Sequence, residues 1–142
     1  MKHKIQQSII GGIVGTAAMT LIMFVAPMMG MPKMNPADMM SGMMGVPLAM
    51  GWLIHFIVGV IFALAYSFLL QALLSKLDNK VLKGTVFGFA VFVFAQIMMQ
   101  LIGAMTDGIP KPTGNMMTLV IGSIIGHIVY GVVTVMFIKE EK

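Results

Sequence analysis

The sequence predicts an all-α protein, a helix bundle that crosses a membrane several times. Of its 142 residues, 58% are hydrophobic and only 10% are charged, and the mean hydropathy is +0.96. Soluble domains carry about 25% charged residues, so these values are typical of a chain that folds in lipid. We therefore interpret the whole chain, 1–142, as a single transmembrane domain.

Four long apolar runs divide the chain, at residues 9–29, 48–74, 81–105 and 118–138. A helix needs about 20 apolar residues to cross the hydrocarbon layer, and each run is close to that length. The runs lack the alternating polarity of a membrane β-strand. The sequence therefore predicts a polytopic four-helix bundle.

Lysines are unevenly placed around these spans. One side of the membrane carries Lys2, Lys4, Lys76, Lys80, Lys83, Lys139 and Lys142, and the other carries Lys33 and Lys111. The positive-inside rule then predicts a multi-pass protein of a prokaryotic cytoplasmic (inner) membrane, with both termini inside. The net charge of +4 is explained by this topology, and without arginine we expect no nucleic-acid partner.

The two halves of the chain resemble each other. Because each half holds two spans, both copies enter the membrane from the same face, which predicts two tandem parallel hairpins, repeat 1 at about 5–74 and repeat 2 at about 78–138. At shifts of 72 or 73 residues the matched positions are Gly11 with Gly84, Gly15 with Gly88, Gly30 with Gly103, Gly51 with Ser123, His55 with His127, and Gly59 with Gly131.

The matched histidines, His55 and His127, are the sharpest functional candidates, and the four-residue spacing of Gly51, His55, Gly59 and Ala63 predicts a buried stripe on the second span. A charged side chain inside a bilayer costs at least about 2.5 kcal/mol, so an ionisable residue there suggests a function. Two neutral imidazoles on facing helices can ligate haem b, and Gly59 and Gly131, one turn away, would leave space for the porphyrin. The alternative is that no cofactor binds and neighbouring polar groups satisfy both rings.

Further polar side chains are expected at a similar depth. Gln96 and Gln100 lie one turn apart in the third span, and Thr16 and Thr20 lie in the first. We predict that they form a polar waist around the histidines, in which a glutamine amide could bond to an imidazole.

Eight methionines crowd residues 28–44, from the end of the first span into the segment that follows it. Four of them, Met31, Met34, Met39 and Met43, form a candidate Cu(I) site, because soft thioethers prefer this ion. The alternative is packing, since methionine fills irregular apolar surfaces. Asn35 as N-cap and Pro36 as first residue predict a short helix that stops at Gly45, with an apolar methionine face on the bundle.

Catalysis is not expected, because none of the four apolar runs contains a carboxylate that could pair with a histidine. Asp38 and Asp107 fall in the connecting segments, and the chain has no cysteine. A small transporter remains an alternative, although proton coupling would then depend on the histidines alone.

Several segments together resemble a family of small four-helix bacterial and archaeal membrane proteins known as a domain of unknown function. They are Gly12-Ile-Val-Gly-Thr16, Met19-Thr20, Ala26-Pro-Met-Met-Gly-Met-Pro-Lys-Met-Asn35, Gly51-Trp-Leu-Ile-His-Phe56 and Gly126-His-Ile-Val-Tyr-Gly131. The resemblance covers nearly the whole chain. It implies the four-span fold and a histidine on the second and fourth helices, and it brings no activity.

The sequence thus favours a non-catalytic membrane protein, an accessory or scaffold subunit of a larger, respiratory type of complex. The rival interpretation is a small haem b or Cu(I) protein that uses the paired histidines. A bundle of four short spans buries little surface between its helices, so we expect a homo-oligomer or partner membrane subunits within the bilayer.

Overall fold

The computed structural model describes residues 1–105 and 114–139, and all regular elements within these ranges are helical. In chain order they are α1 (Lys2–Val25), a 3-10 turn (Ala26–Met29), α2 (Pro36–Met44), α3 (Leu48–Ala65), a π-helical turn (Tyr66–Leu70), α4 (Gln71–Leu73), α5 (Lys80–Met105) and α6 (Met116–Phe137). The expectations for Asp107, Lys111 and Lys142 lie outside the described residues.

Four stretches are long and apolar enough to cross a membrane, namely Lys2–Met29, Leu48–Leu73, Lys80–Met105 and Met116–Phe137. The expected number of long apolar helices and the all-helical fold class are confirmed. The first helix starts before the predicted residue 9, because its polar first turns carry the helix beyond the apolar run.

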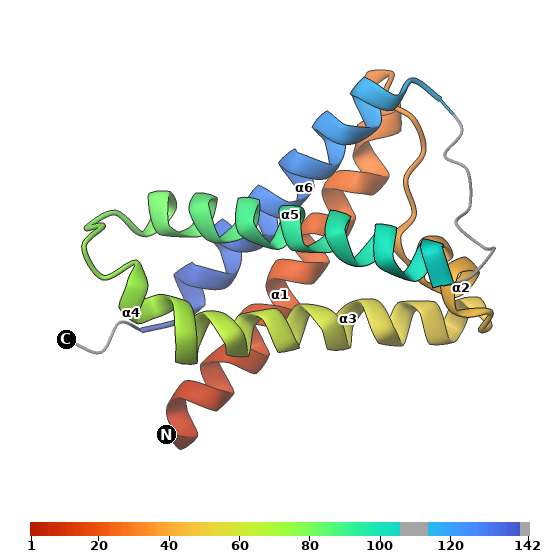
Figure 1. Ribbon diagram of the computed structural model, residues 1–142. Coiled ribbons are helices and arrows are strands. Elements are labelled where there is room, and N and C mark those ends of the chain that lie inside the picture. The colour runs from red at the N-terminus through yellow and green to blue at the C-terminus, as the bar shows by residue number, and fades with distance from the viewer. Residues whose placement is uncertain (106–113, 140–142) are drawn as a thin grey trace.

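Helix α3 packs on α1, α1 packs on α6, and α6 packs on α5, and in Figure 1 α3 and α5 cross α1 and α6 at an angle. The backbones of α3 and α5 approach each other much less closely. These two helices instead meet through aromatic rings, Phe62 with Phe94 at 5.4 Å and Tyr66 with Phe87 at 4.8 Å between centroids. The bundle is therefore tight at its α1–α6 centre and open at its α3–α5 edge.

The start of α1 and the end of α6 lie on one side of the bundle, which we call the terminal side (Figure 1). There the backbone N–H of Lys139 donates to Gln7 Oε1 at 3.0 Å, and Gln71 Nε2 donates to the Lys139 carbonyl at 3.0 Å. Lys80 Nζ donates to the Ile138 carbonyl at 3.1 Å. These bonds join α1, α4 and α5 to the end of α6. The opposite side, which holds α2, is the far side.

The two hairpins, α1 with α3 and α5 with α6, cross at equivalent glycines. A Cβ added at Gly12 would lie 2.8 Å from the Val60 Cα and 3.0 Å from the Gly59 carbonyl oxygen. A Cβ added at Gly84 would likewise meet Val132 and the Gly131 carbonyl oxygen. Gly12 therefore matches Gly84, so a single shift of 72 residues relates both helices of one hairpin to those of the other.

This geometry corrects the predicted shift of 73 for the first and third spans. Gly11 and Gly15 face α6, where their added Cβ atoms would lie 3.0 Å from the Thr134 carbonyl oxygen and 2.9 Å from that of Tyr130. Gly84 and Gly88 face their own hairpin partner instead. The small-residue pairs look alike in sequence, but those of α1 pack between the hairpins and those of α5 pack within one.

The short helix α2 forms as predicted. Asn35 Oδ1 accepts from the Ala37 N–H at 3.0 Å, and the helix ends at Gly45 with a left-handed φ of 62°. The expectation of a methionine face is only partly met, because Met43 is buried whereas Met44 is 55% exposed. The helix contacts α3 mainly through Ala37, whose carbonyl lies against Gly51, since a glycine there permits a close approach.

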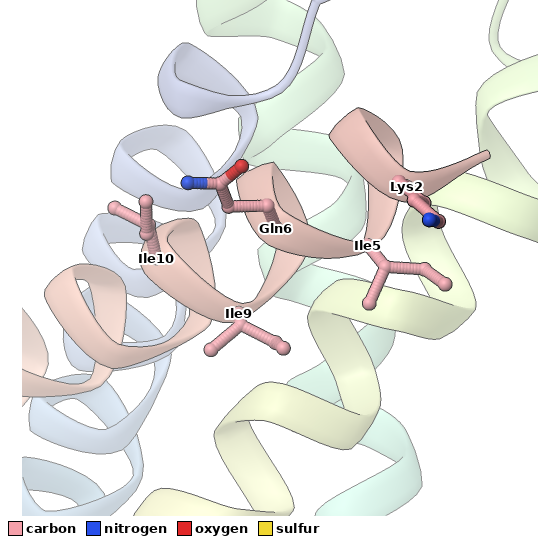
Figure 2. A pocket seen from close by; sticks show the side chains of 5 residues that line it. All are labelled: Lys2, Ile5, Gln6, Ile9 and Ile10. Atoms are coloured by element: carbon pink, nitrogen blue, oxygen red, sulfur yellow. The ribbon is translucent and has the colours of Figure 1, made fainter.

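The outward faces of the long helices are rich in large apolar side chains, including Leu21, Phe24 and Leu69. A surface of this kind suits lipid contact. Figure 2 shows a shallow hollow on that surface near the start of α1, lined by Lys2, Ile5, Gln6, Ile9 and Ile10. All five residues belong to the same helix, so the hollow is a groove between neighbouring side chains of α1.

Candidate functional site

His55 lies in the contact between α1 and α3. It is 7% exposed, and its Nε2 lies 3.1 Å from Thr20 Oγ1. The Thr20 hydroxyl donates its proton to the Thr16 carbonyl at 2.8 Å. Since that hydroxyl has one proton, its oxygen must accept from the imidazole, which assigns the Nε2–H tautomer to His55.

His127 lies in the other hairpin and takes the opposite tautomer. Its Nδ1 is 2.7 Å from the Ser123 carbonyl oxygen, one helical turn earlier on α6. A carbonyl can only accept, so Nδ1 carries the proton and the lone pair of the neutral ring is on Nε2. The ring packs edge-on against Phe92 of α5, with 5.7 Å between centroids.

The two histidines lie in different hairpins, and each ring makes its contacts inside its own, His55 with Thr20 and His127 with Ser123 and Phe92. Ligation of haem through His55 Nε2 would require its bond to Thr20 to break. The haem hypothesis stays a prediction.

Gly59 and Gly131, predicted to make room for a porphyrin, are filled by helix contacts. A Cβ at Gly59 would collide with the Thr16 side chain, and one at Gly131 with the backbone of Gly84 and Gly88. The Gly59 carbonyl also accepts a 2.6 Å hydrogen bond from the Tyr130 hydroxyl. In the structure both glycines serve the close packing of helices.

The predicted stripe on α3 is confirmed, because Gly51, His55, Gly59 and Ala63 are all buried. The predicted polar waist is wrong for the glutamines. Gln96 is half-buried and Gln100 is exposed on the outer surface of α5. The reason is that the fully buried residues of α5 end at Phe92, so both glutamines lie on a less covered part of the helix.

Sequence reasoning missed part of the polar contact between helices. The hydroxyls of Ser8 and Ser67 lie 2.5 Å apart across the α1–α3 contact, and the Thr134 hydroxyl donates to the Gly11 carbonyl at 3.2 Å. Ser8, Gly12, Thr16 and Thr20 recur every four residues on α1, so they share one helix face. That spacing could have revealed a polar seam between α1 and α3.

The four candidate copper ligands separate into two pairs. Met31 and Met34 pack over Gly122 of α6, whereas Met39 and Met43 belong to α2. Within residues 1–105 and 114–139, no three His, Asp or Glu side chains come close enough to hold a metal ion. A site for a hard cation is therefore not formed by the described residues.

Residues 2–139 match a family of unknown function, DUF6789. The chain belongs to this family. The match spans both hairpins and both histidines, so the resemblance seen in the sequence motifs is confirmed. No curated protein and no solved structure matches the DUF6789 chain.

Proposed function

We propose that this DUF6789 protein is a non-catalytic membrane scaffold subunit that pairs with a second copy of itself through the far half of α5. The observation that carries the proposal is the polar pair of Gln96, which is half-buried, and Gln100, which is exposed. Together with Ile97 and Leu101 they line one shallow groove on the surface of that helix.

The position of the glutamines makes an isolated monomer unfavourable. At 1.5 Å per residue, Gln96 and Gln100 lie roughly 20 and 25 Å along the helix from Lys83, inside a hydrocarbon layer about 30 Å thick. Amides exposed to lipid have no water to bond with, and leaving one unpaired costs roughly 2 kcal/mol or more. A partner that offers donors and acceptors at this depth would remove that cost.

A second copy fits because a carboxamide is self-complementary. Each glutamine side chain has two donors and one acceptor, so the same groove on another copy supplies what the first lacks. A two-fold axis along the membrane normal would place both copies of Gln96 at one depth, and both copies of Gln100 at another. Interhelical bonds of this type contribute about 0.6 kcal/mol each on average.

Disulfide cross-linking tests the pairing, and the chain suits it because it contains no cysteine. Gln100→Cys, oxidised in native membranes, is expected to give a covalent dimer. Met98→Cys is the matched control, since Met98 lies at nearly the same depth on the opposite face of α5 and is 37% exposed. Equal cross-linking of the two variants would contradict the proposal.

A second variant tests the chemistry of the contact. Changing both glutamines, Gln96→Leu with Gln100→Leu, is expected to weaken the dimer about tenfold, as measured by energy transfer between labelled copies in liposomes. Met98→Leu should leave it unchanged. Cross-linking of Gln100→Cys to a different protein would exclude the second copy and identify a foreign subunit as the occupant.

A further inference from the structure

Helix α6 buries a second face that the paired histidines do not use. Gly122, Gly126, Tyr130 and Thr134 recur every four residues along it, and Tyr130 and Thr134 pack on α1. At the two glycines the groove is filled by methionines. Met31 and Met34 lie over Gly122, and Met19 and Met23 lie over Gly126.

The thioethers converge on the groove from two parts of the chain. The Sδ atoms of Met31 and Met34 lie 3.6 and 3.9 Å from the point where a Gly122 Cβ would be. One turn along α6, a Gly126 Cβ would lie 3.1 Å from the Met23 Cε and 3.4 Å from the Met19 Cγ. Residues one helical turn apart have Cβ positions about 6 Å apart, so the two methionine pairs are neighbours.

The two methionine pairs are buried to different depths. Met19 and Met23 are each 6% exposed, on one face of α1. Met31 and Met34 are half-buried, in the segment that links the 3-10 turn to α2. An ion that arrives from the far side would therefore meet Met31 and Met34 first, with Met19 and Met23 beneath them.

The chemistry of this cluster selects one class of ion. Thioether sulfur is a soft, uncharged ligand that prefers Cu(I) to harder divalent ions. The described parts of the chain offer no His, Asp and Glu cluster that would favour a hard ion instead. Neutral ligands in an apolar groove also suit a single positive charge better than a double one, because burial cost rises steeply with charge.

We propose that Met19, Met23, Met31 and Met34 form a Cu(I)-binding site on the glycine groove of α6. The site shares Met31 and Met34 with the set predicted from sequence, replaces Met39 and Met43 by two methionines of α1, and does not depend on the pairing of α5. Methionine also moves readily between rotamers, so small side-chain rotations suffice to bring the sulfurs around one ion.

The test is competition for Cu(I) between the purified protein and a chromophoric chelator under anaerobic, reducing conditions. The unmodified protein is expected to bind one ion. Met31→Leu with Met34→Leu, and Met19→Leu with Met23→Leu, should each lower the affinity at least about tenfold, as loss of metal-site residues typically does. Leucine nearly conserves the side-chain volume, so the packing is retained.

The matched control is Met39→Leu with Met43→Leu, which removes the same number of thioethers from α2 and should change the affinity less than about twofold. Circular dichroism and thermal unfolding of every variant show whether the fold is intact. No binding by the unmodified protein, or an equal loss in the control, would overturn the proposal and leave the four methionines a packing role.

Discussion

In the hairpin of α1 and α3, the hydroxyl groups of Thr16 and Thr20 line the contact between the helices, whereas the two matched positions in the hairpin of α5 and α6 are glycine and phenylalanine. Thr16 corresponds to Gly88, and Thr20 corresponds to Phe92. His55 consequently has a hydroxyl partner on the neighbouring helix, while His127 bonds to its own helix and packs against a ring.

The two hairpins share the backbone geometry of their crossing but differ in the side chains around each histidine. Gly59 and Gly131 occupy the same place in the two crossings, so a close contact is kept in both. The side chains opposite the histidines differ between the two hairpins, whereas the crossing is the same. Glycine therefore defines the shared geometry, and the residues one turn away give each histidine a different environment.

The largest expected effect comes from enlarging the glycine at each crossing. Gly131→Ala should lower the free energy of unfolding by about 3 kcal/mol, because the new methyl group meets the backbone of Gly84 and Gly88, which cannot yield unless the helices separate. Gly59→Ala should cost about 1 kcal/mol, because the first atoms it meets belong to the Thr16 side chain. Denaturant titration in micelles measures both.

A double variant sharpens this difference. Thr16→Ala should restore most of the stability lost in Gly59→Ala, since it removes the hydroxyl with which the new methyl group collides. Equal losses for the two glycine variants, or no rescue, would mean that the two crossings are more alike than the structure indicates.

The next largest loss of stability is expected from replacing the hydrogen-bond partners of the histidines. Thr20→Val keeps the side-chain shape but removes the acceptor of the His55 Nε2–H, which should cost about 2 kcal/mol in the free energy of unfolding. It should also shift the tautomer of His55 alone, as followed by nitrogen-15 NMR of the imidazole rings.

Ser123→Ala is the matched change in the other hairpin. The His127 N–H bonds to the backbone carbonyl of residue 123, which the substitution leaves in place, so the loss should be under about 0.5 kcal/mol. A larger loss of stability from Ser123→Ala than from Thr20→Val would contradict the hydrogen-bond partners assigned to the two histidines.

An effect smaller than that of Thr20→Val is expected from a bond between the hairpins that has no counterpart. Tyr130→Phe removes the donor to the Gly59 carbonyl and should cost about 1 kcal/mol. Val58, at the matched position of α3, cannot make such a bond. The unfolding free energy measures the loss, and an unchanged value would mean that this bond does not stabilise the docking of the hairpins.

The sequence predicted well those features that depend on local order. The four spans follow from the apolar runs, α2 from Asn35 and Gly45, and the buried stripe around His55 from its four-residue spacing. Each of these depends on helical periodicity or on local capping, both of which are encoded within a few residues.

The sequence does not predict the features that depend on which helix packs against a given face. The adjacent glycines 11 and 12 allow two alignments with Gly84, and only the position of α6 decides between them. The sequence shows how deep Gln96 and Gln100 lie in the span, but it does not show which part of α5 is covered by the bundle. It therefore predicts both glutamines in the interior. The grouping of Met19 and Met23 with Met31 and Met34 likewise depends on the groove of α6.

The hydrogen bonds at the terminal side connect the end of α6 to three other helical elements. Gln7, Gln71 and Lys80 hold the end of α6 from three directions, while at the other end α5 continues to Met105, which is 85% exposed. Because these bonds reach α1, α4 and α5, a displacement of the end of α6 would have to break all three together.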